Sequence, residues 1–395
     1  MAFLLKLGSR RQVRFELDSP EALENLNRLS GCRQQTVAHG DTLDHFLGHL
    51  PPSSLEELRL RMVRRLIRMK ALDEGRLMGH FLVVIDGTGQ LHFHERHCEH
   101  CLTQTKDGKT TYYHHVLEAK LVTRDGLAIS IGSEFIENSD PKATKQDCEL
   151  KAFERLAPRL KQDYPQLQLC LCLDAIYAKG QTFQTCEDYN WKYLITFKKG
   201  SLPALWREYK VLRRMSPANR KTCLLSQDTR QSFAWVGLEH IDQQRRRHRL
   251  NAFQCLECDG KKRRRFAWLT NFDVQADNVV ELANGGGRCR WKIENEGFNI
   301  QKNGGFNLEH AYSTQERQIK NWYVLLQIAH TMLQLLERGS LLSQDCKRLF
   351  GSIRNVARRL GESLRNWLIP AEALDVAAAA SIQIRLNRRP RLNTS

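Results

Sequence analysis

Short apolar runs alternate with helical patterns through the middle of the chain. The runs at 81–86 and 167–174 are almost wholly apolar, which is typical of strands buried on both faces. The neighbouring patterns predict further elements, namely strands at 113–123, 127–136 and 191–198 and helices at about 143–162 and 181–189. This order predicts an α/β fold with a mixed sheet, whose crossover helices should cover at least one face.

A helical pattern also dominates the N-terminal part of the chain. A helix at about 54–74 is predicted by apolar residues at helical spacing, and Ser54 followed by Glu57 resembles a capping box at its start. Arg59 and the other basic residues of this helix are expected on an outer face, which contacts solvent or DNA phosphates.

A β-rich segment at 199–284 interrupts the α/β order. Its clearest element is a predicted hairpin with strands at 249–258 and 264–270 and a turn at Asp259-Gly260. Basic residues flank this hairpin at a density that favours DNA contact over a solvated loop. They are Arg245, Arg246, Arg247 and Arg249 on one side, and Lys261, Lys262, Arg263, Arg264 and Arg265 on the other.

Five regions are therefore expected. A helical N-terminal region that binds DNA precedes the first part of the α/β core, the basic insertion, the last core helices, and the C-terminal helices with a basic, disordered tail. Gly285-Gly286-Gly287 is expected to act as a flexible joint, and long helices at about 314–337 and 343–367 follow it. The regions are 1–78, 79–198, 199–284, 285–340 and 341–395.

Composition narrows the class of protein. The chain has 395 residues, of which 61 are Lys or Arg and 44 are Asp or Glu, and the resulting charge of +17 favours a polyanionic partner such as nucleic acid. The sequence contains no run of about 18 apolar residues, so no membrane span is expected. The N-terminus has only a short apolar run without a cleavage site, which argues against a secretory signal. Twelve dispersed cysteines, two of them alternating within an apolar strand, favour a reducing intracellular compartment.

Three carboxylates suggest a site for metal ions. Asp86 and Asp174 each end one of the two most apolar strands, and Glu294 lies in RWKIENEGF, which is expected to begin a helix. Each acid alone has an ordinary explanation as a turn former, a helix cap or a surface residue. Together they could hold two Mg²⁺ ions, or Mn²⁺ in their place, which prefer hard oxygen ligands. Arg290 lies four residues before Glu294 and should share its helical face.

The same segments resemble a known family. RWKIE followed by NEGFNIQKNGGFNLEH, together with IDGTG and LCLDAIYAKG, resembles the acidic motifs of bacterial insertion-sequence transposases of the DDE class. The resemblance implies a ribonuclease-H-like core with a β-rich insertion, with Asp86, Asp174 and Glu294 as catalytic and metal-binding residues. It further implies cutting and joining of double-stranded DNA at terminal inverted repeats and at a target, by two protomers bridging two ends, in the bacterial cytoplasm at the nucleoid.

Two positions depart from the family pattern. The family has a tyrosine three residues before the arginine, where this chain has Gly287, and a lysine seven residues after the glutamate, where it has Gln301. Lys302 follows directly and is a candidate to bind DNA in its place, as is Arg290. Glu296 is a less favoured rival of Glu294. The alternatives are a nuclease of the same fold without strand transfer, and an inactive transposase relative that only binds DNA.

A second kind of metal site is suggested by cysteine and histidine spacing. Cys98 and Cys101 lie in a histidine-rich stretch with His94, His97 and His100, and Cys255 and Cys258 form a second C-x-x-C pair. The two pairs could make a tetrahedral zinc site if the fold brings them together, and a histidine-rich loop without metal is the alternative. His114 and His115 are expected to be structural or to lie near DNA.

Overall fold

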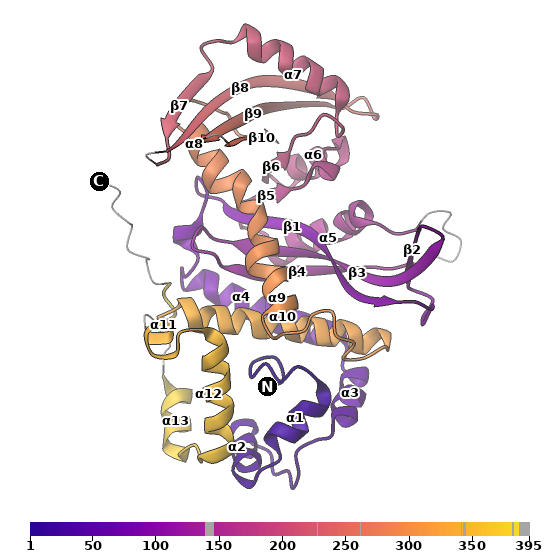
Figure 1. The fold of residues 1–395 in the computed structure, drawn as a ribbon, viewed down its shortest axis with the longest axis vertical. Coiled ribbons are helices and arrows are strands. Elements are labelled where there is room, and N and C mark those ends of the chain that lie inside the picture. The colour runs from indigo at the N-terminus through magenta and orange to yellow at the C-terminus, as the bar shows by residue number, and fades with distance from the viewer. Residues whose placement is uncertain are drawn as a thin grey trace.

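The computed structural model describes residues 1–138, 146–226, 228–260, 262–340, 342, 345–380 and 383–386. Figure 1 shows three parts stacked along the long axis: a β-rich part, a central mixed sheet with helices on its faces, and a helical part that contains both the N-terminus and the last helices. The expected α/β fold with a mixed sheet is confirmed.

The central sheet combines antiparallel and parallel strands. β3 (Lys109–Val122) pairs antiparallel with β1 (Phe81–Phe93) and with β4 (Ala128–Ile136). On the other side of β1, β5 (Leu169–Leu173) is parallel to it, and β6 (Lys192–Thr196) is parallel to β5. The order is therefore β4-β3-β1-β5-β6. β2 (Leu102–Lys106), which the sequence pattern did not predict, pairs with the first half of β3.

Alternate residues of β1 and β5 belong to two separate cores. Val83 and Leu171 pack in the core under α4 (Pro52–Arg68) and α5 (Glu149–Asp163). Val84 and Cys172 point to the other face, where they pack against residues 279–298. Because both faces are covered there, residues 81–85 of β1 and all of β5 are apolar, as strands in the middle of a layered fold must be.

The segment after β6 extends the same sheet. It begins with α7 (Pro203–Met215), and its four strands are β7 (Arg220–Leu224), β8 (Thr229–Ile241), β9 (Arg247–Asp259) and β10 (Lys262–Thr270). The predicted hairpin is confirmed as β9 and β10, with Gly260 of the turn at a φ of +55°. β10 also pairs antiparallel with β6, so the β-rich segment is continuous with the central sheet.

A mostly helical stretch then crosses the face of the sheet that carries Val84 and Cys172, as the orange ribbon from α8 to α9 in Figure 1 shows. It comprises α8 (Val279–Glu281), a π-helical turn (Leu282–Gly286), a 3₁₀ turn (Gly287–Trp291), a second π-helical turn (Ile293–Phe298) and α9 (Asn299–Asn303). We call residues 279–303 the crossing helix.

The expected flexible joint at Gly285-Gly286-Gly287 is wrong. All three glycines are buried within helical turns of the crossing helix. A Cβ atom at Gly286 would lie 2.4 Å from Cδ1 of Leu194, and one at Gly287 would lie 2.3 Å from Nε1 of Trp268. The glycines therefore allow the helix backbone to approach the sheet closely, and this packing explains their presence.

The N-terminal and C-terminal helices form one packed layer. Its helices are α1 (Arg10–Leu17), α2 (Pro20–Ser30), α3 (Gly40–His49), α10 (Glu316–Arg338), α11 (Asp345–Phe350), α12 (Ile353–Asn366) and α13 (Ala371–Ala379). The single helix expected at 343–367 is interrupted at Gly351, which has a φ of +72°. Residues 387–395 of the expected basic tail lie outside the described part of the chain.

Two expectations for α4 are wrong. The helix begins at Pro52 rather than at Ser54, and no side chain caps its N-terminus, because proline is well suited to the first helical turn and needs no N–H partner there. Arg59 is 3% exposed and donates hydrogen bonds to Ser130 and Ser133 of β4, at 3.1 and 2.6 Å. It is therefore a core residue and does not belong to the outer basic face.

None of the helices described by the structure combines the length and the apolar character needed to cross a membrane.

Candidate functional site

Asp86 and Asp174 lie side by side on neighbouring parallel strands. The register of β1 and β5 pairs Val84 with Cys172, and two further residues along both strands lead to Asp86 and Asp174. Since side chains alternate between the faces of a sheet, both carboxylates point to the face of Val84 and Cys172, which the crossing helix covers. Asp86 does not end its strand as expected, because β1 continues to Phe93.

The environment of Asp86 is both buried and charged. Arg290 of the crossing helix donates a hydrogen bond to Oδ2 of Asp86 at 2.8 Å. Burial raises the pKa of Asp86, the Arg290 guanidinium opposes that rise, and the carboxylates of Glu149 and Asp174 add to it. Asp174 lies just after β5, and Nζ of Lys198 is 3.5 Å from its Oδ1. Its side chain does not cap the following 3₁₀ turn, so the cap explanation does not account for it.

Glu149 is a residue that the sequence analysis missed. It is the first residue of α5, and its carboxylate lies 3.4 Å from Nε2 of His115 and accepts a 3.4 Å hydrogen bond from the Tyr177 hydroxyl. His115 and Glu149 also fill the space that a side chain at position 87 would occupy. A Cβ on Gly87 would lie 2.3 Å from Nε2 of His115 and 2.4 Å from Oε1 of Glu149. An acid in the first turn of a helix is ordinary in sequence, so no pattern distinguished it.

Glu294 is exposed on the crossing helix, one turn after Arg290. It does not join Asp86 and Asp174 in a compact group: among the described residues, only one set of three or more His, Cys, Asp or Glu has ligand atoms all within 4.8 Å, and that set contains no acid. Its rival Glu296 lies toward the opposite end of β1. The Oε1 atom of Glu296 approaches Gly126 in the β3–β4 turn, beyond the strand end at Phe81.

The two candidates for the family lysine occupy different environments. Gln301 is fully buried and donates hydrogen bonds to Gln327 at 2.7 Å and to a ring nitrogen of His330 at 2.9 Å. Lys302 forms an ion pair with Glu309 at 3.0 Å. Gln301 is therefore a core residue, and Lys302 is paired with an acid outside the Asp86 site.

A cleft of about 280 Å³ begins beside Asp174. Arg290 and Arg265 contribute cations to its lining, and Phe266 and the 56% exposed Trp291 contribute aromatic surface. A cleft with an acid at one end and arginines and exposed rings along its walls can accept a chain of phosphates with unpaired bases.

The two basic clusters of the β9–β10 hairpin lie at opposite ends of β9, about 40 Å apart at the usual rise per residue. At one end, Arg246 pairs with Asp242 at 2.7 Å and Arg247 with Glu239 at 2.5 Å. At the other end, Arg263 and Arg265 are exposed, and neither has an acidic partner within 4.0 Å among the described residues. Lys262 is also exposed, Arg264 is near Glu257 and Asp259, and Lys261 lies outside the described residues.

The predicted cysteine quartet is not formed. Cys98 and Cys101 lie together, with 3.4 Å between their sulfur atoms, but their neighbours are His97 and His114. Cys255 is buried on β9 in the core of the crossing helix, and Cys258 follows on the same strand. The second pair thus belongs to the β-rich segment, on a strand that does not adjoin β2 or β3.

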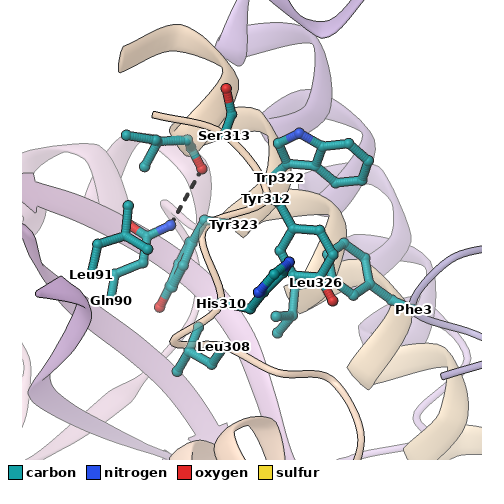
Figure 2. Close-up of a pocket in the computed structure, with 11 residues that line it drawn as sticks. Phe3, Gln90, Leu91, Leu308, His310, Tyr312, Ser313, Trp322, Tyr323 and Leu326 are labelled. Carbon is teal, nitrogen blue, oxygen red and sulfur yellow. Dashed lines mark hydrogen bonds between the residues drawn. The ribbon is translucent and has the colours of Figure 1, made fainter. Parts of the chain in front are cut away.

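The small cavity in Figure 2 is separate from these groups. It measures about 10 Å³ and lies between β1, the start of α10 and the N-terminal segment. The Gln90 amide donates a 3.4 Å hydrogen bond to the carbonyl of Ile319, while Gln90 Oε1 is buried without a partner in the described part of the chain. This volume suits one water molecule rather than a substrate.

Comparisons with known proteins do not identify the chain. No family model matches it, and no curated protein is significantly similar to it.

Proposed function

We propose that this chain is a DDE-type DNA transposase, which cuts the ends of its mobile element and joins them to target DNA in the bacterial cytoplasm. The observation that carries the proposal is the pair Asp86 and Asp174, which occupy matching positions on adjacent parallel strands and face the same helix. A mixed sheet with the acids on β1 and β5, a β-rich insertion before the crossing helix and a strongly basic chain supports a ribonuclease-H-like core.

The donor set fits divalent magnesium or manganese. Carboxylate oxygens are hard ligands. A metal cation beside Asp86 would favour its charged form and so oppose the rise in pKa that burial causes. Two Mg²⁺ ions held by Asp86, Asp174 and Glu294 would activate an attacking water or 3′-hydroxyl and stabilise the leaving oxygen.

Glu294 is favoured over Glu296 as the third acid. Arg290 contacts Asp86, and a residue four positions later stays on nearly the same side of a helix. Glu296 instead pairs with Lys292 at 3.5 Å and faces the far end of β1. Glu149 is a further candidate ligand, because its charge acts on Asp86 directly.

The remaining side chains suit a role in binding and orienting DNA. Arg290 forms an ion pair with Asp86, and its guanidinium is well suited to a scissile phosphate. Tyr177 and His115 orient the Glu149 carboxylate. Arg265 and Trp291 line the cleft that begins at Asp174, where DNA strands would run.

The deciding experiment is incubation of the full chain with duplex DNA carrying its flanking inverted repeats, with Mg²⁺ or Mn²⁺. We expect nicking at the element end and joining of the freed 3′-end to target DNA. Asp86→Ala and Asp174→Ala should abolish both steps while DNA binding persists, and Glu296→Ala should remain active as the matched control. Unchanged nicking by Asp86→Ala would disprove the site.

The same assay separates the alternatives. A nuclease without strand transfer would cut the ends but fail to join pre-cleaved ends to target DNA. An inactive relative would bind the repeats and cut nothing with either metal. A transposase that bridges two ends as a homodimer should cut only when two repeat-bearing duplexes are present together, which paired and single-end substrates distinguish.

A further inference from the structure

We propose that His97, Cys98, Cys101 and His114 bind one structural zinc ion, independently of the acidic site. Their ligand atoms all lie within 4.8 Å of one another, and no other group of three or more such residues in the described part of the chain is as compact. Two thiolates and two imidazoles form a common structural zinc set.

The distances between the ligand atoms match a tetrahedral site. Zn–S bonds of about 2.3 Å and Zn–N bonds of about 2.0–2.1 Å require neighbouring ligand atoms about 3.3–3.8 Å apart. Sγ of Cys98 lies 3.4 Å from Sγ of Cys101 and 3.4 Å from Nε2 of His114, and Sγ of Cys101 lies 3.7 Å from the same nitrogen. These three ligand atoms are therefore close to tetrahedral spacing, and the ligand nitrogen of His97 lies within 4.8 Å of each of them.

The local backbone has the form of a zinc knuckle. The amide of Cys101 donates to the carbonyl of Cys98 at 3.5 Å, which closes the C-x-x-C turn just before β2. His114 comes from β3, where it pairs with Leu91 of β1. The ligands thus come from the β1–β2 connection and from the strand beside it, and a bound ion would fasten one to the other.

Unpartnered buried nitrogens also indicate a ligand. Both ring nitrogens of His97 are buried without a hydrogen-bond partner among the described residues, although its ring stacks on His114 with centroids 5.0 Å apart. A buried imidazole without partners is costly, and coordination to a metal would satisfy one of its nitrogens. His114 and Cys101 are 2% and 0% exposed.

The zinc ion would have only protein ligands and would stabilise the local fold. Four protein ligands fill a tetrahedral shell and leave no position for a reacting water, which is the property of a structural site. The carbonyls of Cys101 and His100 accept hydrogen bonds from Asn138 at the end of β4, at 3.2 and 3.4 Å. His100 also lies 3.2 Å from Glu316, the first residue of α10. The ion would therefore hold the base of the β2–β3 hairpin against the core.

Metal analysis of the purified full chain tests the site. We expect about one zinc per chain in the wild type, and loss of that zinc in Cys98→Ser, Cys101→Ser and His97→Ala. Cys258→Ser and His100→Ala are the matched controls: each removes a cysteine or histidine that sequence spacing alone would also nominate, and each should keep the zinc. A chain without zinc after reconstitution, or zinc retained by Cys98→Ser, would overturn the proposal, as would its loss in Cys258→Ser.

Cobalt substitution provides a test that needs no variant and no folded mutant. Co²⁺ in the wild-type chain should give the visible bands of a tetrahedral complex and a sulfur charge-transfer band with the intensity of two thiolates. A spectrum with four thiolates would indicate the Cys98, Cys101, Cys255 and Cys258 set instead and would overturn the assignment, as would an octahedral spectrum without sulfur bands.

Discussion

At the scale of single residues, Gly287 decides how closely the crossing helix approaches the sheet. The Trp268 indole occupies the space where a side chain at position 287 would lie. The motif that this segment resembles has a tyrosine at this position, whereas this chain has a glycine packed against an indole from β10. The absence of a side chain at position 287 thus has a packing explanation.

The close approach of the Trp268 indole predicts the effect of Gly287→Ala. Alanine normally stabilises a helix relative to glycine by about 1 kcal/mol. Here the new methyl group would lie 2.3 Å from the indole, so overpacking should destabilise the protein by about 1–3 kcal/mol. Gly361→Ala is the control, since no atom lies within 4 Å of that position in α12, and it should stabilise. Chemical denaturation of both variants measures the two signs, and a stabilised Gly287→Ala would refute the packing explanation.

The buried Lys120 should make the free energy of unfolding depend on pH. It is fully buried and donates to Gln327 at 2.5 Å, with Glu118 3.7 Å away. Burial lowers its pKa from 10.5 to about 8, while Glu118 opposes the change. Between these two values the unfolded chain holds a proton that the folded chain has released, so the free energy of unfolding should rise with pH.

The size of this rise is on the order of 3 kcal/mol between pH 8 and 10.5. It should be absent in Lys120→Met, which keeps the apolar stem and removes the titrating group. Urea unfolding of both proteins across this range measures the difference between their pH slopes. Equal slopes would show that Lys120 has no lowered pKa.

At the scale of elements, sequence periodicity predicted the strands and turns that local pattern determines. It missed the features that depend on pairing or packing with distant segments. The β9–β10 hairpin and the two strands that carry Asp86 and Asp174 follow from alternation and turn residues. The continuation of β1 past Asp86 does not, because β3 supplies its pairing partner. Glu149 approaches Asp86, and His114 approaches Cys98, only through tertiary packing, so spacing along the chain could not have found them.

We expect the two basic ends of the β9–β10 hairpin to contribute unequally to the proposed DNA binding. Arg263 and Arg265 lack acidic partners within 4.0 Å in the described part of the chain, and Arg265 lines the cleft at Asp174. Arg263→Ala with Arg265→Ala should weaken DNA binding and lower the salt slope by about 2. Arg245→Ala with Arg247→Ala, at the far end, should have the smaller effect. Binding titrations at several salt concentrations compare the pairs, and equal losses would contradict this division.

At the scale of the whole molecule, the two ends of the chain fold together. Leu364 of α12 packs in one core with Val13, Leu17 and Ala22 of the first helices. The buried amide of Asn25 donates to the carbonyls of Leu364 and Trp367, at 2.9 and 2.7 Å. The N-terminal region is therefore not an independent unit, and its stability depends on the last helices.

Asn25→Ala should destabilise this layer. It leaves buried carbonyls unsatisfied, at a cost of about 1–3 kcal/mol. Asn27→Ala, which removes two exposed hydrogen bonds with the backbone of Gln34, should cost less than Asn25→Ala. Hydrogen exchange of α2 and α12 would report the loss in both helices at once. Loss confined to α2 would mean that the two ends unfold separately.

The pairing of β10 with β6 has a consequence for engineering. Excision of residues 199–284 would leave one edge of the central sheet with bare amide and carbonyl groups along Leu194, Ile195 and Thr196. Such an unpaired edge can pair with another polypeptide, so the shortened protein should aggregate. The β-rich segment thus acts as a protective cover for the sheet that it extends.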